Sequence, residues 1–302
     1  MQTFYMMVGL PGSGKSTYAE SIPNASVMSS DKLREAMFGD QQCQKFNGLL
    51  FDTLHDALLC RMKYGENVVY DATNIDFRRR MDFLSRVRRI FGDSVKCVCV
   101  FMLTPYESCL SMNSGRERKV PDDVIFRMHK NLDIPMYAEG WDEIVFHRPP
   151  ALDYMEKVKD LATLEHDNPH HTLTVGQHCL ATLARLDSDY PNAPEYLRRA
   201  AILHDFGKEK TKGFLDSRGN PSESAHFYNH ERVGAYDSFF YTGDLSHDDQ
   251  LRTALLIRWH MYPYTIDHSN NPEKTRSKLE RLVGPTVMDE IMILNQCDRA
   301  GH

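Results

Sequence analysis

The sequence predicts two domains: an α/β domain whose parallel sheet has helices on both faces, followed by an all-α domain. In the first half of the 302 residues, short apolar runs alternate with amphipathic helical patterns. The second half has helical periodicity and almost no strand signal. The segment His147-Arg-Pro-Pro-Ala is typical of a boundary, because two prolines end a strand and stiffen the exit from it. We expect the domains to cover residues 1–148 and 152–302.

The apolar runs of the first half are short and nearly continuous, as strands covered on both faces require. Cys97 and Cys99 lie in one of these runs, so we interpret them as buried strand residues rather than as metal ligands. The expected strands are Thr3–Val8, Ala25–Met28, Asn67–Asp71, Val95–Leu103 and Trp141–Phe146.

Helical patterns fill the intervals between these strands. Ser30 or Asp31 is expected to cap the second helix, Gly65 to end the third, and Pro121 to start the last. The second expected helix begins with residues 31–36 and continues beyond them. The others are Lys15–Ser21, Phe46–Tyr64, Asp76–Phe91, Pro105–Met112 and Pro121–Asn131. A polar, basic loop is expected at Asn113–Val120.

The second half repeats a helical period without an internal repeat or a low-complexity segment. The expected helices are Tyr154–Leu164, Val175–Leu186, Glu195–His204, His230–Phe240, Gln250–Trp259, Lys274–Val283 and Thr286–Asp298.

The composition excludes several classes of protein. Apolar residues make up 41 % and charged residues 26 %, which excludes a disordered or fibrous chain. No apolar run reaches the roughly 20 residues that cross a bilayer, and the N-terminal MQTFYMMVGLPG lacks the features of a secretory signal. Seven cysteines follow no disulfide or zinc spacing. We therefore expect a cytoplasmic protein without a membrane partner.

Charge and histidine are unevenly distributed. Residues 1–150 hold 19 basic and 19 acidic residues, which leaves 17 basic and 23 acidic residues for the second half. The net charge of −6 argues against a general polyanion binder but leaves room for one local basic groove. A basic helix with Arg78-Arg-Arg80, Arg86, Arg88 and Arg89 either follows a nucleic-acid backbone or is a solvated face. Eleven of the 14 histidines lie in the second half, which indicates metal chemistry or a histidine-rich surface.

A phosphate-binding loop follows the first strand. The segment Gly9-Leu-Pro-Gly-Ser-Gly14-Lys15-Ser16 fits the pattern G-x-x-x-x-G-K-[ST] between a strand and a helix. Lys15 is expected to reach the β- and γ-phosphates of ATP or another nucleoside triphosphate, and Ser16 to hold Mg²⁺. Main-chain N–H groups at the helix start complete the expected nucleotide site: Gly12, Ser13, Gly14, Lys15, Ser16 and Thr17.

Polar residues after the second and third strands are expected at the same edge of the sheet. Asp31 could accept a proton from an attacking hydroxyl, and Arg34 could bind a phosphate of the acceptor. Asp71 is a candidate for supporting the magnesium site or the substrate. The alternatives are that Asp31 only caps a helix, that Arg34 is a surface arginine, and that Asp71 only forms a turn.

Arg116 and Arg118 lie in the basic loop after the fourth strand. Arginines on such a loop could close over a triphosphate and offset the charge on the transferred group. The alternative is a solvated basic loop.

Residues 1–148 resemble the 5′-hydroxyl polynucleotide kinase domain of the end-healing enzymes of phages and bacteria. The resemblance rests on the phosphate-binding loop, on Asp31-Lys-Leu-Arg34, on Asp71-Ala-Thr-Asn74 and on Asn113-x-x-Arg116-x-Arg118-x-Val-Pro. It implies ATP and Mg²⁺ at Lys15 and Ser16, Asp31 as general base for the 5′-OH, and Arg34 on the acceptor's nearest phosphate. Arg116 and Arg118 would be lid arginines on the ATP phosphates.

A second constellation lies in the histidine-rich half. His204 and Asp205 are adjacent, His178 is on an earlier helix and Asp298 on the last one. Two imidazoles and two carboxylates suit a divalent first-row metal. His230 and His260, at other helix ends, could complete a second metal site. An isolated His-Asp pair would instead be structural.

This pattern resembles the HD superfamily of metal-dependent phosphohydrolases. The resemblance covers roughly residues 150–302 and implies hydrolysis of a phosphoester by metal-activated water. One or two divalent metals are implied, of the Mn, Co, Ni, Zn or Fe type, or Mg. His171 and Lys208 could contact the substrate phosphate, or they could be a turn residue and a surface residue.

A kinase domain joined to an HD domain resembles bacterial end-healing enzymes. The chain lacks the Asp-x-Asp-Gly-Thr motif of another phosphatase class, so the HD half is the candidate phosphatase. The first hypothesis is phosphorylation of 5′-OH ends of RNA or DNA, with removal of a 3′-phosphate or opening of a 2′,3′-cyclic phosphate. A separate ligase would act on the products. The alternatives are a small-molecule kinase fused to a nucleotidase, and a nucleotide-gated switch. The oligomeric state stays open.

Overall fold

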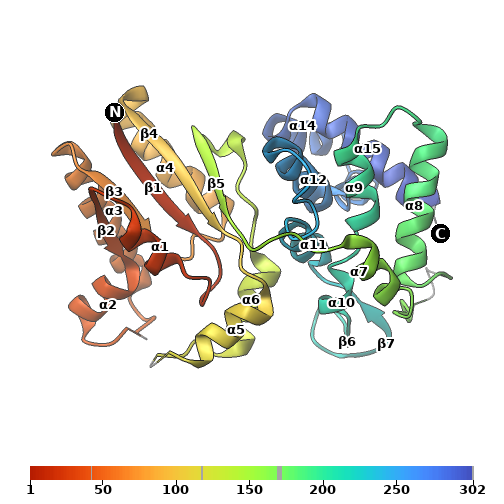
Figure 1. Ribbon diagram of the computed structural model, residues 1–302, viewed down its shortest axis with the longest axis horizontal. Coiled ribbons are helices and arrows are strands. Elements are labelled where there is room, and N and C mark those ends of the chain that lie inside the picture. Colours follow the sequence, from red (N-terminus) through yellow and green to blue (C-terminus); the bar gives the residue numbers. More distant parts are fainter. Residues whose placement is uncertain (42, 117, 169–171, 301–302) are drawn as a thin grey trace. The chain divides into compact units, whose positions relative to one another are not determined.

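The computed structural model describes residues 1–41, 43–116, 118–168 and 172–300 (Figure 1). The chain divides into two compact units. The first comprises Met1–Met128 and Pro135–Pro149, and the second comprises His129–Ile134 and Pro150–His302. The short segment His129–Ile134 therefore belongs to the second unit, a placement that no pattern in the sequence indicated.

The first unit is built on a five-stranded parallel sheet, as predicted. Its strand order is β2-β3-β1-β4-β5. In the centre, Tyr5 of β1 lies opposite Val69 of β3 and Val98 of β4. The strands are β1 (Gln2–Val8), β2 (Ala25–Ser29), β3 (Asn67–Asp71), β4 (Val95–Met102) and β5 (Glu143–His147).

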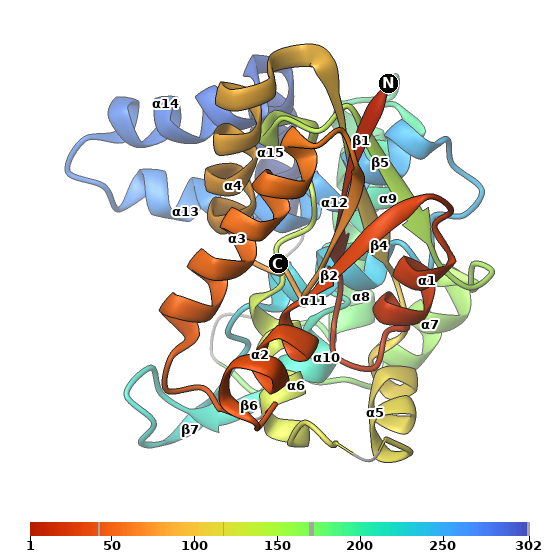
Figure 2. The same ribbon diagram turned by 90° about the vertical axis from the view of Figure 1, so that its left-hand side faces the viewer.

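Helices cover both faces of this sheet (Figure 2). Neighbouring residues of a strand point to opposite faces. On one face, Met7 clusters with Ala19 of α1. On the other face, Phe4 contacts Phe83 of α4 with ring centroids 5.5 Å apart, and His55 of α3 stacks on Phe83 at 4.4 Å. Double coverage explains why β1 and β4 are apolar along almost their whole length.

The helical bounds of the first unit follow the expectations with shifts of one or two residues. The helices are α1 (Lys15–Ser21), α2 (Ser30–Phe38), α3 (Asn47–Lys63), α4 (Phe77–Phe91), α5 (Tyr106–Ser114) and α6 (Asp122–Asn131). The expected cap of α2 is wrong, because Ser29 is the N-cap and its side chain makes no capping hydrogen bond. The helix follows β2 directly, so Asp31 already lies in its first turn.

A buried ion pair ties α4 to the end of the sheet. Arg80 donates from Nε and Nη2 to the two carboxylate oxygens of Glu139, at 2.7 and 2.6 Å. Its Nη1 donates to the carbonyl of Asn74 at 2.9 Å, and Trp141 Nε1 donates to Glu139 at 3.0 Å. Arg80 is 1 % exposed. It therefore supports the turn after β3 and is accessible neither to a nucleic acid nor to solvent, whereas Arg78 and Arg79 beside it are exposed, as a solvated face would be.

The second unit is helical, as predicted, apart from one hairpin. Its helices are α7 (Tyr154–Leu161), α8 (Val175–Asp189), α9 (Glu195–Leu203), α10 (Lys208–Thr211), α11 (His230–Ser238), α12 (His247–Trp259), α13 (Tyr262–Asp267), α14 (Pro272–Val283) and α15 (Pro285–Ala300). The antiparallel hairpin pairs β6 (Gly213–Leu215) with β7 (Pro221–His226). The sequence did not indicate this hairpin, α10 or α13, because each is too short to establish a periodic pattern.

The part of the chain that the structure describes contains no helix with both the length and the apolar character needed to cross a bilayer.

The buried pair predicts a large loss of stability on substitution in α4. Arg80→Met leaves the Glu139 carboxylate buried without its cation, which costs about 3–5 kcal/mol of unfolding free energy. Chemical denaturation followed by circular dichroism measures this change.

Arg86→Met is the matched control on the same helix, because Arg86 pairs with Asp56 at 2.9 Å on the surface. Such exposed pairs contribute less than about 1 kcal/mol. Equal losses for the two variants would contradict the structural role of Arg80.

Candidate active sites

The phosphate-binding loop packs closely against α5 because Gly12 lies at the point where the two main chains are nearest. Gly12 has φ 82°, and a Cβ there would lie 2.3 Å from the carbonyl oxygen of Cys109. Thr104 Oγ1 donates to the carbonyl of Ser13 at 3.1 Å, which ties the loop to the end of β4. No larger residue fits position 12 without moving α5. The motif therefore has the backbone shape that phosphate binding requires.

Lys15 is buried beneath this loop. Its Nζ donates to the carbonyl of Leu10 at 2.6 Å. Burial lowers the pKa of Lys15 to about 8, opposed by the charge of Asp71 and reinforced by that of Arg116. Such an ammonium has lost most of its water and gains strongly from a phosphate.

Ser16 and Asp71 meet across the sheet edge. Ser16 Oγ donates to Asp71 Oδ2 at 2.8 Å, and Asp71 is 4 % exposed. The turn after β3 is held to the phosphate-binding loop, since Gly9 N donates to the carbonyl of Thr73 at 3.1 Å. Asn74 Nδ2 donates to the carbonyl of Met7 at 2.8 Å. A hydroxyl backed by a carboxylate suits Mg²⁺, which prefers oxygen ligands.

Asp31 lies between two arginines. Its Oδ1 is 3.0 Å from Arg34 Nη1 and 2.9 Å from Arg118 Nη1. Arg34 is 5 % exposed, and its Nη2 donates to Asn47 Oδ1 at 3.0 Å. The structure thus brings together three residues that the sequence singled out. Asn47 was missed, because a lone asparagine at a helix start carries no signal for this contact.

The loop that carries Arg116 and Arg118 is held by Asn113. The side chain of Asn113 donates to the carbonyl of Val120 at 2.8 Å and accepts from its N–H at 3.0 Å. Asn113 is 2 % exposed. Arg116 is exposed on this loop, whereas Arg118 reaches Asp31. The loop is therefore fixed at its base.

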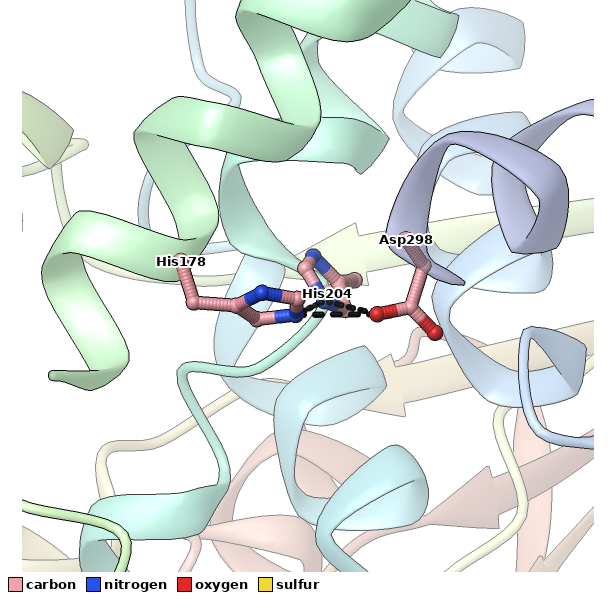
Figure 3. A group of neighbouring side chains, drawn as sticks. All are labelled: His178, His204 and Asp298. Atoms are coloured by element: carbon pink, nitrogen blue, oxygen red, sulfur yellow. Dashed lines mark hydrogen bonds and ion pairs between the residues drawn. The ribbon is translucent and has the colours of Figure 1, made fainter. Parts of the chain in front are cut away.

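In the second unit, three residues from distant segments converge (Figure 3). His178 comes from α8, His204 follows α9 and Asp298 comes from α15. His178 Nε2 lies 2.9 Å from Asp298 Oδ1 and 3.2 Å from His204 Nε2. All three side chains are buried.

A second group lies beside the first and shares a carboxylate with it. Asp205 Oδ1 is 3.4 Å from His230 Nε2 and 4.0 Å from His260 Nε2, which are 3.3 Å from each other. Asp205 Oδ2 is 3.5 Å from His178 Nε2 and 3.4 Å from His204 Nε2. Asp205 thus faces both groups, as a bridging ligand of two cations would.

The histidines are oriented for metal binding. The Nδ1 atoms of His204, His230 and His260 lie 2.7–2.9 Å from main-chain carbonyls, which can only accept. Each neutral ring therefore carries its proton on Nδ1 and turns the Nε2 lone pair inward. Metal–nitrogen bonds of about 2.0–2.1 Å place neighbouring ligand atoms roughly 3.0–3.4 Å apart. The separations between His178 and His204, 3.2 Å, and between His230 and His260, 3.3 Å, match this spacing, whereas Asp205 Oδ1 lies farther from His260, at 4.0 Å.

The charge state of the cluster fits the same interpretation. Burial is the largest effect on the pKa of His260 and lowers it to about 3, so this imidazole is neutral. Burial also opposes the charge on Asp205, yet Lys208 and His204 hold the pKa of Asp205 well below its usual value. Although burial opposes a charge on His204, Asp205 and Asp298 raise the pKa of His204 to about 10, so this ring must give up a proton when a cation binds. Neutral imidazoles and ionised carboxylates are the forms that bind metals.

Lys208 and a residue that the sequence analysis missed lie at the edge of this cluster. Lys208 Nζ is 2.7 Å from Asp205 Oδ2 and 3.1 Å from His166 Nε2. His166 is 1 % exposed and its Nδ1 lies 2.8 Å from the carbonyl of Leu173. His166 precedes α8 in an irregular segment, so no periodicity pointed to it. The predicted residue His171 lies outside the described residues.

Gly207 permits the tight turn that carries Asp205 and Lys208. A Cβ on Gly207 would lie 2.1 Å from the carbonyl oxygen of His230 and 2.6 Å from the N atom of Gly234. Only glycine allows α11 to approach the turn this closely. The position of His230 at the start of α11 therefore depends on a residue without a side chain.

Comparison with known proteins finds two domain families along the chain. Residues 4–135 match the family described as AAA domain, and residues 170–298 match the family described as HD domain. These matches confirm the two predicted kinds of domain, an α/β P-loop domain and an HD domain.

One curated relative is an L-seryl-tRNA(Sec) kinase of Methanococcus maripaludis. It is 20 % identical over 194 residues, which cover 61 % of this chain and 73 % of the relative. Two solved structures of a Pnkp1/Rnl/Hen1 RNA repair complex are also similar, each at 22 % identity, with TM-scores of 0.36 and 0.32. The matches cover 42 % and 40 % of this chain, and 42 % and 41 % of the chains in those structures.

The shared carboxylate predicts how metal content responds to substitution. Asp205→Ala is expected to lower the occupancy of both metal sites, because both groups lose a ligand. His260→Ala is expected to lower the occupancy of only one site. Elemental analysis of the dialysed protein measures metal ions per chain.

His268→Ala is the control, because His268 is an exposed histidine of the same unit. Its metal content should equal that of the wild type. An unchanged content in Asp205→Ala, with normal circular dichroism, would contradict the bridging arrangement.

Proposed function

We propose that this chain, which joins an AAA-type P-loop domain to an HD domain, repairs the ends of broken nucleic-acid strands. The first domain would transfer the γ-phosphate of ATP to a 5′-OH end of RNA or DNA. The second would remove a 3′-phosphate or open a 2′,3′-cyclic phosphate. The observation that carries the proposal is the position of Asp31 between Arg34 and Arg118, in the same unit as a phosphate-binding loop.

In the kinase reaction, Asp31 accepts the proton of the attacking 5′-OH. Arg34 is held by Asn47 and binds the acceptor's nearest phosphate, which places the hydroxyl for attack. Lys15 binds the β- and γ-phosphates, and Arg116 and Arg118 offset the charge that develops on the transferred group. Ser16, hydrogen-bonded to Asp71, would hold Mg²⁺, which would supply positive charge to the triphosphate.

Because Arg118 contacts Asp31 directly, the loop that carries it must release this carboxylate when an acceptor binds. Phosphate groups are stronger partners for the guanidinium than an exposed carboxylate is. Binding of the triphosphate would therefore free Asp31 for its role as base.

In the second domain, six side chains would hold two divalent cations: His178, His204, Asp205, His230, His260 and Asp298. Such cations supply an activated water and polarise the phosphoester. Lys208 is fixed between Asp205 and His166 and presents its charge to the substrate phosphate. The inward-facing Nε2 atoms keep the ligand set in place before substrate arrives.

The relative named as an L-seryl-tRNA(Sec) kinase supports phosphate transfer to an acceptor carried by RNA. Together the two proposed activities leave a 5′-phosphate and a 3′-OH, the pair of ends that a ligase joins. A ligase acting downstream is therefore the expected partner.

The second candidate is a small-molecule kinase fused to a metal-dependent nucleotidase. The net charge of −6 favours it, because a general nucleic-acid binder is usually basic. Competition separates the two candidates. Free nucleosides should outcompete oligonucleotides under this alternative and have little effect on the end-repair reaction.

The test of the proposal uses one substrate for both reactions. A 5′-OH oligonucleotide with a 3′-phosphate is incubated with γ-labelled ATP and Mg²⁺ or Mn²⁺, and both ends of the product are analysed. End repair gives labelled 5′ ends and free 3′-OH ends. ATP hydrolysis or nucleoside phosphorylation without any labelled oligonucleotide would refute it.

Substitution of Asp31 separates the chemistry of the two domains. Asp31→Asn should lower 5′-phosphorylation by about 10²–10⁴-fold, since it removes the general base, and leave 3′-dephosphorylation unchanged. His204→Ala should have the opposite effect. Initial rates of both reactions on the same oligonucleotide measure this.

Glu35→Gln is the matched control for Asp31→Asn, because Glu35 is an exposed carboxylate on the same helix. It should retain wild-type rates. Near-normal 5′-phosphorylation by Asp31→Asn would exclude Asp31 as the base.

A further inference from the structure

The β6–β7 hairpin leads directly into the metal cluster of the second unit. A two-stranded hairpin is marginally stable by itself. Here, Ala225 N donates to the carbonyl of Asp167 at 2.9 Å, and Lys212 Nζ pairs with the Asp167 carboxylate at 2.6 Å. β7 ends at His226, only four residues before His230. The hairpin is thus anchored, and its end lies close to the cluster.

Phe227 connects this hairpin to the cluster. Its carbonyl lies 2.9 Å from His230 Nδ1 and so orients a candidate metal ligand. Its ring centroid is 5.4 Å from Lys208 Nζ and 5.9 Å from the ring centroid of His166. Phe227 therefore borders the position proposed for the substrate phosphate.

The residues on either side of Phe227 form a stacked aromatic pair. The rings of His226 and Tyr228 are almost parallel, at 8°, with centroids 5.2 Å apart. His226 Nε2 lies 3.1 Å from Ser222 Oγ, and this contact fixes the His226 ring. Tyr228 is 43 % exposed. An ordered aromatic ring thus stays open to solvent beside a phosphate-processing cluster.

The backbone that carries this ring lies close to the cluster. Tyr228 is two residues before His230 along the chain, so their Cα atoms are at most about 7 Å apart. A nucleotide whose terminal phosphate lies at the metals would carry its base within a similar reach. Hydrogen-bond readout of the base is not required, because every nucleobase has a stacking face.

We propose that Tyr228, supported by His226, stacks on the nucleobase of the terminal nucleotide whose phosphate the second domain removes. This proposal rests on the hydrolytic function proposed above and adds its substrate class: a phosphoester attached to a base-bearing nucleotide. Preformed stacking reduces the ordering cost of binding. The site accepts any base and discriminates against phosphoesters that lack one.

The experiment compares two oligonucleotides that end in a 3′-phosphate and differ only in whether the last nucleotide carries a base or is abasic. Tyr228→Ala should raise KM for the base-bearing end by roughly 10-fold, in line with base–aromatic stacking, with kcat almost unchanged. KM for the abasic end should not change. Tyr228→Phe, which keeps the ring, should behave as the wild type.

Leu215→Ala is the matched control, because Leu215 is 55 % exposed on the other strand of the same hairpin. Its KM values should equal those of the wild type. Equal KM increases on both substrates for Tyr228→Ala, or no increase on either, would overturn the stacking role.

A binding measurement separates this proposal from the function on which it rests. An oligonucleotide with a 3′-terminal 2-aminopurine and 3′-phosphate should lose fluorescence on binding the metal-loaded wild type, and keep it with Tyr228→Ala. Hydrolysis of both substrates by the wild type with no quenching refutes the stacking role alone. Absence of hydrolysis of either substrate refutes the proposed hydrolytic function and, with it, the substrate class.

Discussion

The carboxylate of Asp205 is the group on which the second unit depends. One oxygen faces one pair of histidines and the other oxygen faces a second pair. A buried charge is costly unless the surroundings compensate it. The compensation comes from Lys208 and from the imidazoles, and bound cations would add to it. The ends of four helices must therefore meet within a few ångströms, and Gly207 allows the closest of these approaches.

The first unit also brings charged side chains together, but they are less buried than those of the second unit. A parallel sheet presents the ends of its strands at one edge, so the phosphate-binding loop and the turn after β3 lie side by side by construction. Hydrogen bonds then connect the loop and the turn. Arg80, which is paired with Glu139, donates to the main chain of this turn and fixes it. Asp31 stays half exposed, as its proposed role toward an acceptor requires. The candidate site of the first unit is thus shaped by main-chain geometry, and that of the second by converging side chains.

Local patterns in the sequence were sufficient for much of this structure. The phosphate-binding loop is a continuous motif, and the apolar runs of the sheet are visible without knowledge of their neighbours. Asp298 was a candidate by residue type, but it lies 120 residues from its partner His178, so no local pattern placed the two side chains together. Arg80 and His166 could not be identified. A run of three arginines is typical of an exposed face, and the carboxylate that buries Arg80 lies 59 residues away. His166 has no periodic context, and its role depends on a lysine from another segment.

The segment His129–Ile134 has a consequence for dividing the protein. It is interior to the sequence of the first unit yet belongs to the second, where Asp133 accepts from Arg258 at 3.0 Å and pairs with Arg232 at 2.8 Å. A fragment that begins at Pro150 would lose this carboxylate and leave the buried Arg258 guanidinium without it. A single cut cannot separate the two units intact. Each activity is therefore best isolated by silencing the other site within the whole chain, rather than by expressing halves.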